Sequence, residues 1–170
     1  MLIEGMGFVL AIAAYFYLMP FEKAWPPHGR PPDLLWGTLF TAGALLSEIP
    51  NVWLNRAAHR QDLRQVQFGL WLMTGIGVAL LGLRAMEFTA LNEHWTRSAY
   101  GSIVWAIMVL HTVHTVTDVY DSGVLAAISV RKTMTGRKMS DVADNALYWH
   151  FIVLSWVVLY AIVYWVPRWS

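Results

Sequence analysis

Three ionisable side chains are spaced along one apolar segment so that a helix would carry them on a single polar stripe. They are His111, His114 and Asp118, which follow one another at intervals of three and four residues. Such a stripe is consistent with a metal or haem site, with a proton path, or with hydrogen bonds between helices. The spacing does not separate these alternatives, because it supplies only two histidines on one helix and haem ligation needs only one axial histidine.

Other ionisable residues also lie in apolar surroundings, at Glu4, Glu48, Glu87 and His150. Arg84 lies three residues before Glu87, which places both on one helix face and predicts a structural ion pair near the headgroups. An ionisable group inside a bilayer costs several kcal/mol, so each of these residues is expected to face protein or water. If Glu4 lies deep in the bilayer, we expect it to be protonated or paired with a neighbouring helix or subunit.

The composition indicates that the apolar surroundings are lipid. The 170 residues are 57% hydrophobic and only 14% charged, whereas a soluble domain has about 25% charged residues. Ten tryptophans are typical of the aromatic belts at membrane interfaces. The net charge of +1 argues against nucleic acid as a partner. The sequence contains no cysteine, which excludes disulfides, iron–sulfur clusters and thiolate metal sites.

Five apolar segments each approach the ~20 residues that cross a hydrocarbon core of ~30 Å. They are residues 2–19, 34–54, 66–88, 100–122 and 143–166. A proline-rich stretch ends the first segment, since proline lacks the backbone donor, and polar loops separate the others. The first segment is interpreted as a helix rather than a signal peptide, because it has no basic leading region and no small-residue cleavage site. The sequence therefore predicts an all-α bundle of five transmembrane helices, forming a single membrane domain over residues 1–170.

Lysine and arginine are distributed unevenly among the loops. One side of the membrane would carry Arg56, Arg60, Arg64, Arg131, Lys132, Arg137 and Lys138, and the other Lys23, Arg30, Arg97 and Arg168. The positive-inside rule then places the second and fourth loops in the cytoplasm. With five spans, the N-terminus is expected in the cytoplasm and the C-terminus in the periplasm or outside the cell.

The order of several short motifs resembles cytochrome c oxidase subunit III of the haem–copper oxidases over nearly the whole chain. The matching pieces are Glu4 before Ala13-Ala14-Tyr15-Phe16-Tyr17, Trp25-Pro26-Pro27, Ala57-Ala58-His59-Arg60, Arg84-Ala85-Met86-Glu87-Phe88, Tyr100-Gly101-Ser102, Leu110-His111-Thr112-Val113-His114, Arg131, and Tyr148-Trp149-His150-Phe151. Two of them stand where the family has Gln-Ala-x-Glu-Tyr and Phe-His-Gly-x-His, and the last matches the family directly. The common order of the pieces carries the resemblance, rather than any one of them.

The chain departs from the family pattern in identifiable places. The family's first two helices have no counterpart, so the five segments correspond to family helices three to seven. In the full form those two helices build a V-shaped, lipid-filled cleft with the others, which five helices cannot build alone. Thr112 stands in place of a glycine and Val153 in place of an aspartate, which indicates a divergent branch.

The resemblance implies a non-catalytic subunit of an aerobic respiratory complex in the bacterial inner membrane. It implies that this chain binds no cofactor, that haem and copper lie in subunit I, and that the partners are subunits I and II and membrane phospholipid. The subunit would support proton uptake and the stability of the catalytic core. On this interpretation Glu4, Glu87, His111, His114 and His150 form a buried polar network. Glu4 matches the family's carbodiimide-reactive glutamate, and Arg131 is expected to contact a lipid headgroup.

Three alternatives remain open from the sequence. The chain could be an accessory, subunit III-like protein of a nitric oxide reductase. It could be a membrane redox protein that uses His111, His114 and His150 as ligands. It could also be a small proton-coupled transporter that uses Glu4, Glu48 and Asp118, in which case Pro50 could break one helix, as is common in transporters.

Overall fold

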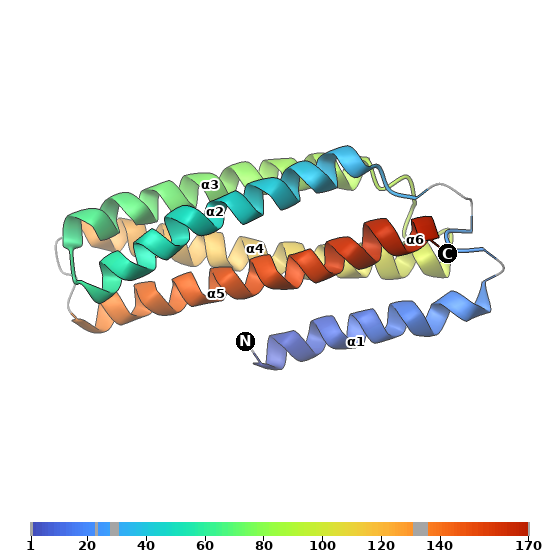
Figure 1. Ribbon diagram of the computed structural model, residues 1–170, viewed down its shortest axis with the longest axis horizontal. Coiled ribbons are helices and arrows are strands. Elements are labelled where there is room, and N and C mark those ends of the chain that lie inside the picture. Colours follow the sequence, from blue (N-terminus) through green and yellow to red (C-terminus); the bar gives the residue numbers. More distant parts are fainter. Residues whose placement is uncertain (1, 23, 28–30, 131–135, 170) are drawn as a thin grey trace.

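The computed structural model describes residues 2–22, 24–27, 31–130 and 136–169, and within these ranges it contains helices and no strand. The elements are α1 (Leu2–Leu18), a 3-10 turn η1 (Met19–Phe21), α2 (Leu34–His59), α3 (Leu63–Thr89), α4 (Ala99–Val130) and α5 (Gly136–Tyr160). From α5 the chain continues through a π-helical turn, η2 (Ala161–Trp165), into α6 (Val166–Trp169), so that the last three elements form one long rod (Figure 1). The prediction of an all-α protein is confirmed.

Helices α2 to α5 form an elongated bundle, and α1 lies along its outside (Figure 1). α2 packs against α3 and α5, and each of these packs against α4. α1 packs mainly against α4 and to a smaller extent against α5. The turn from α2 to α3 and the start of α5 share one end of the bundle, and the C-terminus lies at the other (Figure 1). Successive long helices therefore run in opposite directions.

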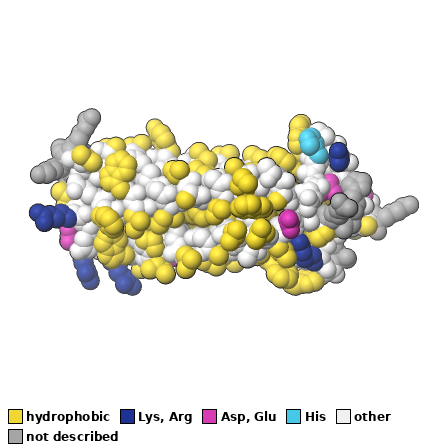
Figure 2. Space-filling model, turned by 90° about the horizontal axis from the view of Figure 1, so that it is seen from above, with side chains coloured by type: hydrophobic (Ala, Val, Ile, Leu, Met, Phe, Trp, Pro, Cys, Tyr) yellow, Lys and Arg dark blue, Asp and Glu magenta, His cyan; other side chains and the backbone are white. Residues whose placement is uncertain are grey.

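The exterior of the bundle is suited to lipid. Four helical stretches are long and apolar enough to cross a membrane, namely Ile3–Phe21, Leu63–Thr89, Ala99–Val130 and Gly136–Trp169. α2 has 26 residues and packs between two of them, but polar residues such as Ser47, Glu48 and Asn51 occupy its middle. Apolar side chains cover the middle of the surface, whereas Lys and Arg side chains lie toward its ends (Figure 2). The chain is a multi-pass membrane protein.

The helices follow the predicted spans in order but extend beyond them. α4 continues to Val130 rather than ending at residue 122, and α5 begins at Gly136 rather than at residue 143. Hydropathy marks the part of a helix inside hydrocarbon, whereas a helix continues as long as its backbone bonds and contacts support it. Contacts with the rest of the bundle hold the added turns. Gln67 on α3 donates to the Ser129 carbonyl in the added part of α4 at 2.5 Å, and Met139 and Val142 in the added part of α5 are buried.

Pro50 lies inside α2 and does not interrupt it. The helix runs without a break from Leu34 to His59 and ends in a tight turn, after which Asp62 caps α3 by accepting from the backbone N–H groups of Arg64 and Gln65. The discontinuous helices that are typical of secondary transporters are therefore not found at Pro50.

The close approach of α3 to α4 depends on a glycine. A Cβ added at Gly77 would lie 2.4 Å from Cγ2 of Val119 on α4. A valine in a helix has one strongly preferred rotamer, so Val119 cannot turn away at low cost. Small residues at such positions let transmembrane helices pack closely.

Gly77→Ala is expected to destabilise the bundle by about 1–3 kcal/mol relative to the variant Gly75→Ala, which is the usual cost of overpacking. Gly75→Ala is the control, because a Cβ there meets nothing within 4 Å. Both substitutions gain the same helix propensity, about 1 kcal/mol, so their difference isolates the clash. Unfolding of the detergent-solubilised protein by increasing SDS measures both variants. Equal midpoints would contradict the packing argument.

Candidate functional site

An arginine lies inside the bundle and pairs with a glutamate of the same helix. Arg84 Nη1 donates to Glu87 Oε2 at 2.7 Å, and each side chain is only 1% exposed. The ion pair predicted from the three-residue spacing is confirmed. It lies among the helices rather than on the surface of the bundle, so both charges are removed from lipid and from water.

A tyrosine near the C-terminus donates a second hydrogen bond to Glu87. Tyr164, in the π-helical turn η2, donates its hydroxyl to Glu87 Oε1 at 2.5 Å. A glycine on α2 makes room for this ring, since a Cβ at Gly37 would lie 2.4 Å from the Tyr164 Cζ atom. Glu87 therefore receives one hydrogen bond from its own helix and one from a residue 77 positions away.

His111 on α4 joins the same group through both of its ring nitrogens. Nδ1 lies 3.1 Å from Arg84 Nη2, and Nε2 lies 3.1 Å from the carbonyl oxygen of Ile152 on α5. A guanidinium only donates and a carbonyl only accepts, so Nδ1 accepts and Nε2 carries the proton. The imidazole is therefore neutral, with both nitrogens occupied by hydrogen bonds.

Two aromatic rings cover the faces of the guanidinium. Arg84 Cζ lies 3.7 Å from the ring centroid of Phe40 on α2 and 3.8 Å from that of Trp156 on α5. A cation is attracted to the face of an aromatic ring, most strongly where water is absent. Trp156 is held in turn by the hydrogen bond that its Nε1 donates to Thr41 at 2.8 Å. We name Arg84, Glu87, His111, Tyr164, Phe40 and Trp156 the Arg84 network, which links α2, α3, α4, α5 and η2.

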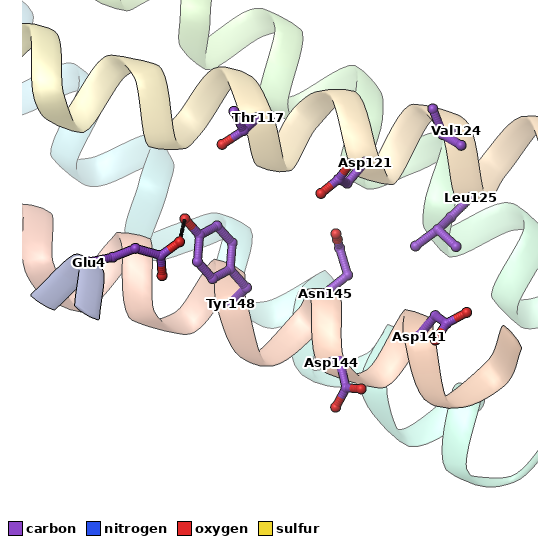
Figure 3. Close-up of a pocket in the computed structure, with 9 residues that line it drawn as sticks. All are labelled: Glu4, Thr117, Asp121, Val124, Leu125, Asp141, Asp144, Asn145 and Tyr148. Atoms are coloured by element: carbon purple, nitrogen blue, oxygen red, sulfur yellow. Dashed lines mark hydrogen bonds between the residues drawn. The ribbon is translucent and has the colours of Figure 1, made fainter. Parts of the chain in front are cut away.

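The other residues expected in one polar network lie apart from the Arg84 network. His114 Nδ1 bonds the Leu110 carbonyl of its own helix at 2.7 Å, and its ring centroid lies 5.0 Å from that of Phe8 on α1. Glu4 on α1 accepts from the Tyr148 hydroxyl at 3.1 Å (Figure 3). Of the five residues grouped by the resemblance, the structure thus brings together Glu87 and His111.

The fifth of these residues, His150, lies at the boundary between α5 and α2. Its Nδ1 pairs with Glu48 Oε2, and both side chains are partly exposed. Arg131, the expected lipid-headgroup contact, lies outside the described residues.

Glu4 and Tyr148 border an open acidic pocket between α4 and α5, with a volume of about 610 Å³. Its carboxylates are Glu4, Asp121, Asp141 and Asp144. Thr117 and Asp121 extend from α4 toward Asn145 on α5, and the Glu4–Tyr148 hydrogen bond lies at one side (Figure 3).

Asp118, the last member of the predicted stripe, lies on α4 and is 1% exposed. Neither of its carboxylate oxygens has a hydrogen-bond partner among the described residues. The three acids of the transporter alternative occupy different places: Glu4 borders the pocket with Tyr148, Glu48 pairs with His150, and Asp118 lies inside the bundle. The three acids therefore have different surroundings in the structure.

The histidines of the redox alternative do not converge either. Within the described part of the chain, no group of three or more His, Cys, Asp or Glu side chains is placed to hold a metal ion. Both nitrogens of His111 are already bonded, and His150 faces Glu48. Among the described residues, these histidines therefore do not come together in a shared metal site.

Several members of the Arg84 network could not be found from sequence spacing. Phe40, Trp156 and Tyr164 are distant from Arg84 along the chain, and each lies in a segment rich in other aromatic residues. The one available signal was Arg84 itself, because an arginine in an apolar segment requires compensating partners.

The sequence of the chain matches the family model of cytochrome c oxidase subunit III over residues 5–169. A subunit 3 from Thermostichus vulcanus is 24% identical over 171 residues, which cover 97% of this chain and 83% of the relative. Subunit 3 of Cyanidium caldarium is 27% identical, over 95% of this chain and 63% of the relative. Subunit 3 of Ornithorhynchus anatinus is 26% identical, over 83% of this chain and 55% of the relative.

The fold and the site define a multi-pass helical membrane protein whose helices are joined by a closed, buried ionic network. The match over nearly the whole chain goes further: the chain belongs to the cytochrome c oxidase subunit III family. The resemblance inferred from the order of motifs is confirmed. The chain spans only 63% and 55% of the length of two of the relatives that it matches.

Arg84→Met is expected to destabilise the protein by about 3–5 kcal/mol, because it leaves Glu87 buried without its counter-charge. Adding Glu87→Gln removes that charge, so the double variant should recover a substantial part of the loss. SDS unfolding of the two single variants and the double variant completes the cycle. Arg97→Met, at an exposed position, is the control and should be nearly neutral. A double variant whose loss equals the sum of the two single losses would show that the two charges are not coupled.

Proposed function

We propose that this chain serves as subunit III of a cytochrome c oxidase complex in a bacterial inner membrane and carries no redox centre of its own. The family match over residues 5–169 carries the proposal. The Arg84 network supports it, because this network fills the interior in which a cofactor or substrate would need space. The cavity bordered by Phe40, His111 and Trp156 is about 10 Å³, far below the ~300–1,000 Å³ of pockets that hold small molecules and cofactors.

In this role the chain packs against the haem- and copper-bearing subunit I and adjoins subunit II. A bundle fixed by an internal ionic network presents a surface of constant shape, which suits a scaffolding subunit. The end that carries Arg56, Arg60 and Arg64 faces the cytoplasm by the positive-inside rule. The N-terminus is then cytoplasmic and the C-terminus is periplasmic.

The pocket beside Glu4 is where this subunit would support proton uptake, whereas phospholipid binding is proposed at basic residues of the chain. Its carboxylates lie toward the end of the bundle that we assign to the cytoplasm, and such groups can take up and release protons. Glu4 is held by Tyr148 at the edge of the pocket rather than in the closed interior. Arg131 is proposed as a contact for a lipid headgroup.

Affinity purification of the tagged chain from mild detergent tests the assignment. We expect a complex that contains this chain beside a polypeptide with haem and copper. The chain separated from that complex should show no haem absorbance and no stoichiometric copper. Stoichiometric haem or copper on the separated chain would overturn the proposal. Reduction of nitric oxide rather than oxygen by the complex would instead assign the chain to a nitric oxide reductase.

Glu4→Ala is expected to shorten the period over which the complex sustains turnover, while its initial rate changes little. The reason is that Glu4 borders the acidic pocket proposed to support proton uptake, away from any redox centre. Oxygen consumption followed over many turnovers measures both quantities. Glu22→Ala, at an exposed glutamate that does not border this pocket, is the matched control and should decay as the unmodified complex does. Unchanged decay in Glu4→Ala would contradict the proposed role.

A further inference from the structure

A histidine reaches the outer surface of the bundle along the boundary between α2 and α5. His150 Nδ1 pairs with Glu48 Oε2 across this boundary. The side chains of His150 and Glu48 are 31% and 22% exposed, but the carboxylate oxygens of Glu48 are covered by protein. The imidazole is therefore the polar group that this surface presents to its surroundings.

This imidazole lies near mid-depth in the bundle. Glu48 lies eleven residues before the end of α2 at His59, which is about 16 Å along the helix at ~1.5 Å per residue. The whole of α2, with 26 residues, is about 39 Å long by the same measure. His150 is paired with Glu48 and so lies at the same depth. The imidazole therefore lies away from both ends of the bundle.

The surface around His150 is apolar. Leu147 and Leu154, about one turn away on either side along α5, are 47% and 68% exposed. Leu45 and Ile49 on α2 are 50% and 70% exposed. We name these four residues together with His150 the His150 face.

The outer nitrogen of His150 has no partner within the described chain. The imidazole uses Nδ1 for Glu48, and no described residue bonds to Nε2. A polar group that faces hydrocarbon without a hydrogen bond is unfavourable, so intramembrane ionisable residues normally face protein or water. Lipid tails cannot satisfy Nε2, whereas a side chain of a neighbouring helix can.

The contact between α2 and α5 does not account for this exposed imidazole. Two hydrogen bonds join these helices in the interior nearby: Trp149 Nε1 donates to Ser47 Oγ at 2.8 Å, and Asn51 Nδ2 donates to the Ala146 carbonyl at 2.9 Å. The pair of His150 and Glu48 lies at the outer edge of the same boundary. The exposed imidazole of His150 therefore faces away from the bundle, toward a further chain.

We propose that the His150 face is the docking surface for a transmembrane helix of the haem-bearing chain, which presents a hydrogen-bonding side chain to His150 Nε2. This inference rests on the proposed function and adds to it the face by which the subunit docks. The four exposed aliphatic side chains supply apolar contact on both sides of the imidazole. One polar contact within an apolar helix interface fixes the register of the two helices.

Photo-crosslinking in the intact membrane tests which chain covers this face. The photoreactive residue p-benzoylphenylalanine replaces Leu147 or Leu154 in separate variants, and replaces Val78 in the control. Val78 is 58% exposed near the middle of α3, which lies across the bundle from α5. We expect adducts with the haem-bearing chain from positions 147 and 154, and none with it from position 78.

The outcomes separate this inference from the proposed function. If the haem-bearing chain co-purifies but forms adducts from position 78 alone, the docking face is wrong and the proposed function stands. Adducts from 147 and 154 with lipid only, or with a second copy of this chain, likewise overturn the docking face. If no haem-bearing chain co-purifies, the proposed function fails and the inference fails with it.

A pair of double variants tests whether the polar contact contributes to docking. Glu48→Leu with His150→Phe removes both ionisable groups and should lower the yield of intact complex by about tenfold, equivalent to ~1.4 kcal/mol. Thr38→Val with Tyr160→Phe removes the exposed hydroxyl pair on the same two helices, whose oxygens lie 2.7 Å apart, and should leave the yield unchanged. Circular dichroism establishes that both variants keep their helices. Equal yields of intact complex for the two folded variants would overturn the polar contact. A loss of yield in the control variant alone would overturn it as well.

Discussion

The arrangement of the bundle depends on one charge, the guanidinium of Arg84, which is buried among its helices. Removing an ion from water costs several kcal/mol unless good partners replace the solvent. Glu87 supplies the opposite charge, His111 an acceptor nitrogen, and Phe40 and Trp156 two aromatic faces. These partners come from four helices. A rotation or sliding of any one helix would therefore remove a contact from the buried charge, so the network holds the four helices in one mutual arrangement.

Two polar pairs outside the Arg84 network lie at the margins of the bundle rather than in its interior. The Arg84 network is closed, since its ionic side chains are almost entirely buried. Glu4 with Tyr148 and Glu48 with His150 instead lie at boundaries between helices, beside a pocket and at the outer surface. A closed ionic core with polar groups at its margins is the arrangement expected of a subunit that holds its own shape and acts through its neighbours. The membership of the chain in the subunit III family agrees with this division.

Much of the fold follows from local features of the sequence. Apolar length predicts the helices, and the spacing of Arg84 and Glu87 predicts their ion pair, which the structure confirms. The ends of α4 and α5 were predicted too short, because hydropathy does not register polar turns that are held by contacts such as that of Gln67 with the Ser129 carbonyl. The order of motifs was sufficient to indicate the family, since a shared order needs no knowledge of which helices touch.

The sequence by itself determined the solvent of this protein, its helices, its family and the one ion pair formed within a single helix. Only the tertiary structure decided that Tyr164 reaches Glu87 and that His111 bonds the Ile152 carbonyl, while His150 faces outward beside Glu48. The physical reason is that helical periodicity relates residues a few positions apart on one helix. Contacts between helices depend on how each helix is rotated and on how far it is shifted along its neighbour. Those two quantities are set by packing, including the space that Gly37 leaves for Tyr164.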